Sequence, residues 1–505
     1  MEKFCPHPNP PPLGGGGNSA GSANQPSPAQ RGREGPAKRE GGGTAPRLRI
    51  RAIELYERPV RFVKPFRFGA VTVEEAPQAF VRALVSVEGK GEAWGSTAEM
   101  MMPKWFDKNP ARTPAETVDG LRLSLQTARA AYLADDRLDS AFGHHVAAYG
   151  AQLQACRVAG LPDLTAAYGP ALIDKAVLDG LLRALGVDFF TGMAANVAGL
   201  DARLTPDLAG FDLDAYLGRL APLGSVAIRH TVGLLDEPAD LRGLLERQRL
   251  TRFKIKLGGD VAADVERLRT IARVLDTTVE GVAEGYRATL DGNEQYADAG
   301  ALTALVEAME REPALAVFRH HLLYIEQPIA REKALAEPLG CLAMRIPVII
   351  DESDDGYDAF PRARAAGYRG VSSKSCKGLY KALLNRARCA AWGAPHFISA
   401  EDLTCQAGLA VQQDTALVAL LGIGHAERNG HQYVDGFDGA AEADAFHDAH
   451  PGFYTREGGT VRLATAGGSL PTKPLAVPGF ASAAEPAWDR LIPLQEPESF
   501  REFAP

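Results

Sequence analysis

Eight short β-rich runs alternate with seven helical segments in the second half of the chain, and this repeat constrains the fold more than any other feature. The runs are 225–234, 252–258, 286–293, 322–328, 347–353, 370–376, 396–402 and 424–433. Strands separated by helices at this spacing predict a parallel sheet with crossover connections. Eight such strands close most simply into a (β/α)8 barrel, with an open doubly wound sheet as the fallback. No glycine-rich phosphate fingerprint follows the first run, which argues against the open sheet.

A different pattern precedes the repeat. Residues 47–60 alternate like a strand, and residues 80–99 predict two strands joined by a glycine turn, followed by three helical stretches. We therefore expect the chain to have four parts. They are a disordered Pro/Gly/Ser-rich tail (1–46), an α+β capping domain (47–200), the barrel (201–435) and a C-terminal segment (436–505) that packs back on the capping domain.

Composition narrows the class of partner. The formal net charge of −8 argues against a general binder of nucleic acids or membrane surfaces. The N-terminal 46 residues contain no apolar segment of the secretory type, and no apolar run elsewhere is long enough to span a bilayer. We expect a cytoplasmic protein whose partner is a small molecule.

Charged residues stand where five consecutive strands end. They are separated by 35, 35, 25 and 23 residues, each about one strand–helix unit, and are Lys256, Asp291, Glu326, Asp351 and Lys374. The carboxyl ends of parallel barrel strands form one rim, where active sites of such barrels lie. A single acid there is explained by a helix cap or a salt bridge, but three on successive apolar strands are costly to bury without a function.

Three converging carboxylates suit a hard divalent cation, most naturally Mg²⁺ with Mn²⁺ as a possible substitute. These strand ends carry no His or Cys, which disfavours zinc. Lys256 and Lys374 flank the acids from either side, and Lys254 shares the face of Lys256 because side chains alternate along a strand. For Lys254, a supporting salt bridge and a direct role are equally compatible with the pattern.

The ordered motifs "KIK", "LDGN", "IEQP", "IDES" and "SSKSCKG" resemble the enolase superfamily, in particular the mandelate racemase/muconate lactonizing enzyme family and its muconate-lactonizing subgroup. The resemblance covers roughly 47–450 and implies an enolase-like capping domain before a modified (β/α)8 barrel of the TIM type. It also implies an acid/base pair of Lys256 and Lys374, an auxiliary Lys254 and a supporting Asn293. The Mg²⁺ ligands that it implies are Asp291, Glu326 and Asp351.

The chain departs from its relatives at the last strand. The Asp-x-Asp by which dipeptide epimerases hold an ammonium group is absent, so Glu427, Arg428 and His431 become candidates for specificity or for plain salt bridging. Glu401 and Asp402 follow the seventh strand and could cap the next helix.

The segment 95–110 of the capping domain contains three consecutive methionines and Trp105. This composition suits either an apolar lid over the substrate or ordinary core.

The function expected is Mg²⁺-dependent removal of the proton α to a substrate carboxylate through a stabilised enediolate. Two opposed lysines favour racemisation or epimerisation, with dehydration by β-elimination and cycloisomerisation as alternatives on the same scaffold. A metal-binding barrel without turnover is the alternative from another class. We also expect a homo-oligomer.

Overall fold

The eight β-rich runs form eight parallel strands of one curled sheet, in the order β10-β9-β8-β7-β6-β5-β4-β11. A computed structural model describes residues 45–69, 71–278, 285–495, 497 and 500 of the chain, so the disorder predicted for 1–46 lies outside the described residues except at positions 45 and 46. The strands are β4 (Ser225–Val232), β5 (Arg252–Lys256), β6 (Arg287–Asp291), β7 (Leu322–Glu326), β8 (Val348–Ile350), β9 (Gly370–Ser373), β10 (Phe397–Ala400) and β11 (His425–Glu427). The expected barrel-type α/β fold is confirmed.

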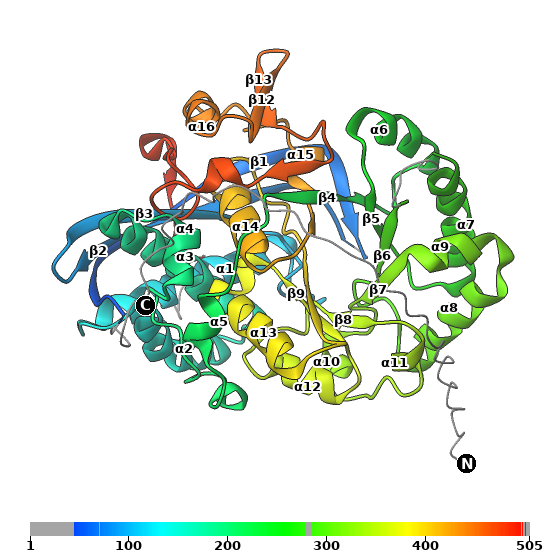
Figure 1. Ribbon diagram of the computed structural model, residues 1–505, viewed down its shortest axis with the longest axis horizontal. Coiled ribbons are helices and arrows are strands. Elements are labelled where there is room, and N and C mark those ends of the chain that lie inside the picture. The colour runs from blue at the N-terminus through cyan, green and yellow to red at the C-terminus, as the bar shows by residue number, and fades with distance from the viewer. Residues whose placement is uncertain (1–44, 70, 279–284, 496, 498–499, 501–505) are drawn as a thin grey trace, which may run out of the picture. The chain divides into compact units, whose positions relative to one another are not determined.

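Helices connect these strands or follow the last of them, and Figure 1 shows α7 and α8 on the outer side of the sheet beside β5 to β7. They are α6 (Leu241–Gln248), α7 (Val261–Thr278), α8 (Ala299–Arg311), α9 (Ala316–His321), α10 (Arg331–Ala334), α11 (Leu342–Arg345), α12 (Ala359–Ala365), α13 (Leu379–Trp392), α14 (Leu409–Leu420) and α15 (Gly430–Tyr433). The strands β10 and β11 are the two ends of the strand order, and hydrogen bonds of Asp402 connect the residues that follow them. Asp402 accepts a hydrogen bond from the backbone N–H of Asn429 (2.6 Å), while its own N–H donates to Glu427 (3.2 Å).

An antiparallel sheet in the order β15-β1-β2-β3 precedes the barrel in the chain, with its edge strand β15 supplied by the C-terminal segment. The strands of this sheet are β1 (Leu48–Phe68), β2 (Val71–Val87), β3 (Gly91–Met100) and β15 (Ile492–Pro493). The helices that follow β3 are α1 (Pro114–Ala134), α2 (Ala141–Val158), α3 (Asp163–Leu185), α4 (Phe189–Ala194) and α5 (Leu213–Leu217), and β1 to β3 with these helices are called the capping region below. The start of α1 follows from its sequence. Thr113 and Glu116 form a reciprocal capping box, and Pro114 occupies the first turn, where its missing N–H costs nothing.

The strand β1 continues eight residues beyond residue 60, where the sequence predicted it to end. It contains two prolines, Pro59 and Pro65, which are uncommon inside strands. β15 pairs with β1 only at Tyr56 and Glu57, so the later part of β1 has a free edge that tolerates proline. A register shift between Arg61 and Phe66 absorbs the second proline. The β1–β2 hairpin therefore reaches much further than its sequence suggests.

The strand β3 and the helix α3 approach each other unusually closely. A Cβ atom at Gly95 would lie 2.0 Å from the backbone nitrogen of Gly180 and 2.2 Å from the carbonyl oxygen of Ala176. Only glycine fits at such a contact, which locks the strand against the helix.

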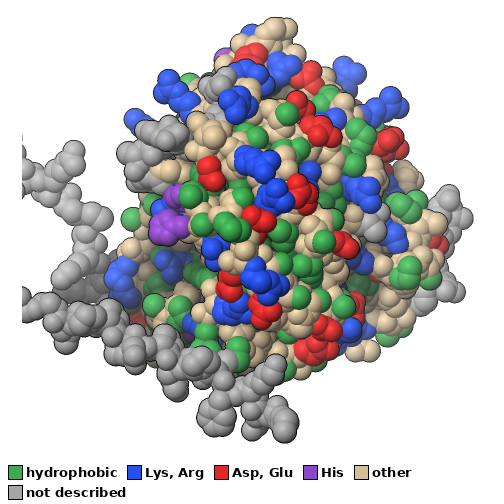
Figure 2. Space-filling view, turned by 90° about the vertical axis from the view of Figure 1, so that its right-hand side faces the viewer, with side chains coloured by type: hydrophobic (Ala, Val, Ile, Leu, Met, Phe, Trp, Pro, Cys, Tyr) green, Lys and Arg blue, Asp and Glu red, His purple; other side chains and the backbone are tan. Residues whose placement is uncertain are grey.

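The C-terminal segment contacts both regions. It contains α16 (Ala443–Ala449), β12 (Tyr454–Glu457), β13 (Thr460–Leu463) and β14 (Ser469–Pro471). β14 pairs with the barrel strand β4, whereas β15 pairs with β1. Among the described residues, no helix is long and apolar enough to cross a membrane. Figure 2 shows basic and acidic side chains interspersed over one face of the molecule.

Candidate active site

The five charged strand ends lie together at one rim of the barrel. Strand pairing sets Lys256 opposite Asp291, and Asp291 opposite Glu326. The three acids are fully buried, and the lysines Lys256 and Lys374 are 5% and 4% exposed. Burying so many charges is tolerable only when each is paired, and at this rim every acid has an ammonium group beside it.

The acids Asp291, Glu326 and Asp351 form the centre of the rim. Asp291 accepts a hydrogen bond from Lys256 (2.6 Å), and Asp351 accepts one from Lys374 (2.5 Å). Burial opposes ionisation of Asp351, but Lys374 and Lys377 outweigh it and hold the pKa of this carboxyl well below its ordinary value.

Glu326 differs from the other two acids. Burial and then the neighbouring Asp291 and Glu401 raise the pKa of Glu326 well above its ordinary value. Its Oε1 accepts a hydrogen bond from Lys254 (2.9 Å), whereas its buried Oε2, although near the same ammonium group, has no hydrogen-bond partner among the described residues.

The donor set of these three acids fits Mg²⁺, since hard carboxylate oxygens meet at one rim and one buried oxygen lacks a donor. In the described part of the chain, however, no three His, Cys, Asp or Glu side chains already converge as a metal-ligand cluster. The carboxylate oxygens instead form ion pairs with the lysine ammonium groups. A cation at this rim would have to compete with them.

Lys254 is the most heavily paired cation of the site. Its ammonium group lies 2.7–2.9 Å from oxygens of four acids, which are Asp291, Glu326, Glu401 and Glu427. Burial alone would lower the pKa of Lys254, but these acids, Asp291 first, raise it well above its ordinary value. The side chain is 1% exposed, so its charge acts entirely inside the barrel.

Lys256 and Lys374 approach the acids from opposite flanks, since β6, β7 and β8 lie between their strands. Lys256 also donates to Asn293 Oδ1 (2.8 Å), and Asn293 in turn donates to Glu352 (3.2 Å). The ammonium group of Lys374 lies 4.1 Å from the ring centroid of Trp105, within cation–π range. Burial favours a lower pKa for Lys374, but the carboxylate of Asp351 outweighs burial and raises it.

A small cavity of about 20 Å³, with room for about one water molecule, lies over Lys254, Lys256 and Lys374. Its apolar cover comes from the capping region, as Phe66 and Phe68 from the β1–β2 hairpin, and Met102 and Trp105 from the segment after β3. Its polar wall comes from barrel loops and consists of Asn293, Asp402, Thr404, Glu427 and Asn429.

The segment 95–110 is mostly buried, and two of its residues, Met102 and Trp105, line the cavity. Met100, Met101 and Met102 are buried, as core residues would be. Arg331 donates to the backbone oxygens of Trp105 (3.1 Å) and Phe106 (2.9 Å), which ties the segment to the barrel.

The candidates at the last two strands have different surroundings. Glu427 lines the cavity, whereas Arg428 pairs with Asp414 (2.8 Å) and does not line it. His431 is half-buried away from the cavity lining.

The expectation that Glu401 and Asp402 cap the next helix is wrong. Glu401 instead binds Lys254 and Arg229, while Asp402 accepts the N–H of Cys405 (2.9 Å), ahead of α14. Gly408, without a side chain to bond, is the N-cap of α14.

Asn429 and the hairpin residues Phe66 and Phe68 were missed by sequence reasoning. The Nδ2 of Asn429 donates to Glu427 (2.8 Å), which fixes the amide orientation because a carboxylate only accepts. Its Oδ1 is then left as a buried acceptor without a partner among the described residues. The strand-end position could have suggested Asn429, but nothing local in the sequence signals how far the hairpin reaches.

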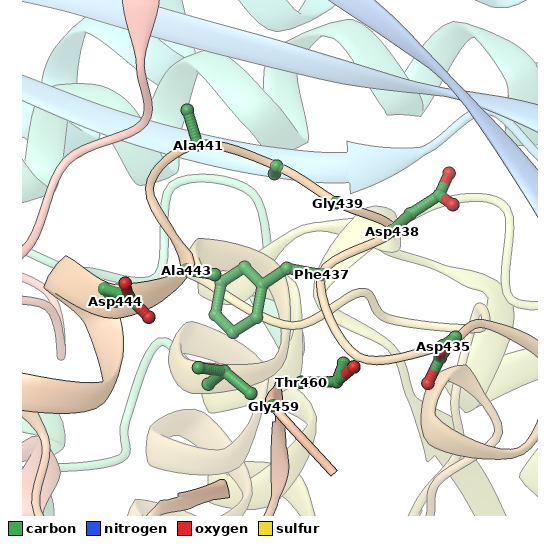
Figure 3. Close-up of a pocket in the computed structure, with 11 residues that line it drawn as sticks. Asp435, Phe437, Asp438, Gly439, Ala441, Ala443, Asp444, Gly459 and Thr460 are labelled. Atoms are coloured by element: carbon green, nitrogen blue, oxygen red, sulfur yellow. The ribbon is translucent and has the colours of Figure 1, made fainter. Parts of the chain in front are cut away.

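A larger open pocket lies elsewhere, in the C-terminal segment, and Figure 3 shows its lining around Phe437, Asp438 and Asp444. It contains none of the charged strand ends. Its acids Asp435 and Asp444 pair with Arg462 (2.5 Å) and Arg456 (2.7 Å), as ordinary surface ion pairs do. Lys254, Lys256 and Lys374 line the smaller cavity at the barrel rim, not this pocket.

Comparison with known proteins agrees with this fold. Residues 237–468 match the family of enolase C-terminal domain-like proteins. This match spans the barrel but covers less than half of the 505 residues, so it shows an enolase-type C-terminal domain in that part of the chain. No curated protein sequence matches the chain significantly.

Solved structures share the fold at low sequence identity. A dipeptide epimerase from Enterococcus faecalis, complexed with Mg and L-Leu-L-Tyr, is 16% identical with a TM-score of 0.56, over 86% of this chain and 99% of that one. The L-Ala-D/L-Glu epimerase from Bacillus subtilis is 16% identical with a TM-score of 0.54, over 86% and 99%. A muconate lactonizing enzyme from Mycobacterium smegmatis, complexed with muconolactone, is 17% identical with a TM-score of 0.58, over 88% and 98%.

Proposed function

We propose that the chain is a Mg²⁺-dependent racemase or epimerase that removes and returns the proton α to a substrate carboxylate. The observation that carries this proposal is the placement of two lysines, Lys256 and Lys374, on opposite flanks of one acidic rim and in one cavity. Two bases that face a carbon from opposite sides allow one to take the proton and the other to supply one, which inverts the centre.

In this proposal Asp291, Glu326 and Asp351 hold Mg²⁺. When bound, the ion would bind the substrate carboxylate and stabilise the enediolate formed on proton removal. Lys374 has to separate from Asp351 before it accepts a proton, because that carboxylate favours the ammonium form. The four acids around Lys254 keep it charged, so its role is to add fixed positive charge beneath the substrate rather than to act as a base.

The cavity lining supports a substrate class. The apolar cover of Phe66, Phe68 and Trp105 suits a hydrophobic substituent. The unpartnered Oδ1 of Asn429 suits an N–H or O–H donor on the substrate, since a buried acceptor without a donor is costly. Asp402 and Glu427 have their oxygens engaged within the protein, so they are poorly placed to bind a substrate ammonium group. We infer a small acid with an apolar group and an amide or hydroxyl donor.

The test is α-proton exchange in D₂O, followed by NMR, on enzyme stripped with EDTA and then given Mg²⁺. The substrates are matched acids with and without the donor, such as N-acetylphenylalanine, its N-methyl analogue, phenyllactate and 3-phenylpropanoate. We expect Mg²⁺-dependent exchange that favours the acids with a donor. Exchange that persists after EDTA would refute the metal requirement. With an added β-hydroxy acid, N-acetyl-β-hydroxyphenylalanine, loss of water in place of inversion would assign the chain to the lyases.

A further inference from the structure

A buried ion pair of the capping region lies outside the lining of the cavity. Glu99 on β3 and Lys175 on α3 are 0% exposed, and their charged groups lie 3.1 Å apart. Such a pair contributes little net stability, because removing two charges from water offsets their attraction. Stability therefore does not explain why this ion pair is buried at this position.

The pair contacts the loop that carries Lys374. Ser375 follows Lys374 directly, and its hydroxyl donates to Glu99 Oε2 (2.9 Å), with Lys175 Nζ 3.5 Å from the same hydroxyl oxygen. From the barrel side, the N–H of Ser375 donates to Asp414 on α14 (3.3 Å). The residue after the lysine is thus held from both the capping region and the barrel.

The same strand also places the ring over Lys374. β3 ends at Met100, and the chain continues to Trp105, whose ring faces the Lys374 ammonium group. Tyr168 on α3 donates to the carbonyl oxygen of Met100 (3.2 Å), and the close contact at Gly95 fixes α3 against β3. One rigid unit, β3 with α3, therefore contacts Lys374 through its backbone neighbour and through its ammonium group.

We propose that Glu99 and Lys175 are positioning residues that hold Lys374 in place from the capping region, through Ser375. The identity of Lys374 as an acid/base group rests on the proposed function, but its positioning can be measured without turnover. The other proposed acid/base residue, Lys256, contacts Asp291 and Asn293 of the barrel, and Lys108 of the segment after β3 donates to the backbone oxygen of Asn293 (3.1 Å).

The first test reads the position of Lys374 through Trp105. The chain has four tryptophans, so 5-fluorotryptophan labelling gives a simple ¹⁹F spectrum, in which Trp105→Phe assigns the resonance and Lys374→Met shows the effect of losing the cation. The variants are Glu99→Gln, Lys175→Met and the double variant, which leaves no unpaired charge. Asp174→Asn is the matched control, because Asp174 is a buried acid on α3 whose side chain bonds Tyr132 of α1 (2.7 Å) and pairs with His145 of α2 (2.7 Å).

We expect the Trp105 resonance to move in the three test variants and to stay in place in Asp174→Asn. An unmoved Trp105 resonance in the folded double variant would overturn the proposal. Should that variant not fold, Ser375→Ala removes only the connecting hydroxyl, and an unmoved resonance there has the same meaning.

A second readout separates positioning from general damage. If the two lysines serve opposite faces, exchange of the enantiomer served by Lys374 should fall in kcat by on the order of 100-fold, the effect of a displacement of about 1 Å, with exchange of the other enantiomer retained. Equal losses for both enantiomers would show that the pair acts on overall structure instead. A wild type that exchanges neither enantiomer would refute the proposed function and leave the ¹⁹F result to decide this inference.

Discussion

Lys254 shows how single residues define this site. Its neighbour on the same strand face, Lys256, has one acid and one amide as partners, but Lys254 has four carboxylates within 2.9 Å. Four acids this close would repel one another strongly without a central cation. The ammonium group therefore organises the barrel rim, and its loss should be structural before it is catalytic.

We predict that Lys254→Met lowers the free energy of unfolding by about 3–5 kcal/mol at pH 7, the usual cost of stripping a buried charge of its partner. Urea unfolding followed by circular dichroism measures this. Lys333→Met, which changes an exposed lysine, is the control and should stay within about 0.5 kcal/mol of the wild type. Equal midpoints for Lys254→Met and the wild type would contradict the pairing of Lys254 with the four acids.

At the scale of single residues, the sequence predicts where the charged side chains of the site lie but not which groups they bind. The positions of Asp291 and Glu326 follow from strand alternation and from the unit length, because both are local properties of the chain. The bond of Lys254 to Glu401 joins residues 147 positions apart, so it depends on sheet curvature that no local pattern encodes. Phe66 is missed for the same reason, since its place depends on the reach of a hairpin.

Among the elements, β4 and β11 carry a pair that depends on pH. Arg229 of β4 donates to His425 Nδ1 of β11 (2.7 Å), so the imidazole has to be neutral to accept. Burial and then the guanidinium of Arg229 lower the pKa of His425 to about 3. In the unfolded chain the same imidazole binds a proton below its ordinary pKa of 6.5.

The folded state is thus favoured above pH 6.5, and this contribution is lost as pH falls from 6.5 toward 3. We predict that His425 alone removes about 2 kcal/mol of stability between pH 7 and pH 5, at roughly 1.4 kcal/mol per pH unit below 6.5. Unfolding free energies at the two pH values measure the effect. His425→Gln keeps an acceptor for Arg229 without titrating, so its pH dependence should be shallower by that amount, and an identical slope would refute the prediction.

The sequence predicts the eight barrel strands best, because each is a short β-rich run and helical segments separate successive runs along the chain. β1 is predicted worst. Prolines normally end a strand. Pro59 is tolerated because β15 covers only two residues of that edge, and Pro65 because the register shifts between Arg61 and Phe66.

On the scale of the whole molecule, the site is shared between regions. The barrel supplies the charges, while the β1–β2 hairpin and the segment after β3 supply the apolar cover. Assembly of the cavity therefore requires the capping region and the barrel together, and a cation bound at the rim should stabilise both.

We predict that Mg²⁺ raises the melting temperature of EDTA-treated protein, since a ligand at 100 times its Kd adds about 2.7 kcal/mol to stability. Asp351→Asn removes one proposed ligand and should abolish most of the shift, which differential scanning fluorimetry detects. Asp435→Asn, in the unrelated pocket of the C-terminal segment, is the control and should respond like the wild type. A shift that is unchanged in Asp351→Asn would place the cation elsewhere.

The roles of the two lysines are tested by comparing α-proton exchange of the two enantiomers of one substrate in Lys256→Ala and Lys374→Ala. Each variant should lose exchange of one enantiomer by about 10²–10⁴-fold, the usual contribution of an acid/base group, and retain exchange of the other, with the two variants affected in opposite senses. Exchange of both enantiomers that survives in both variants would contradict the two-lysine mechanism, because the base would then be a different residue.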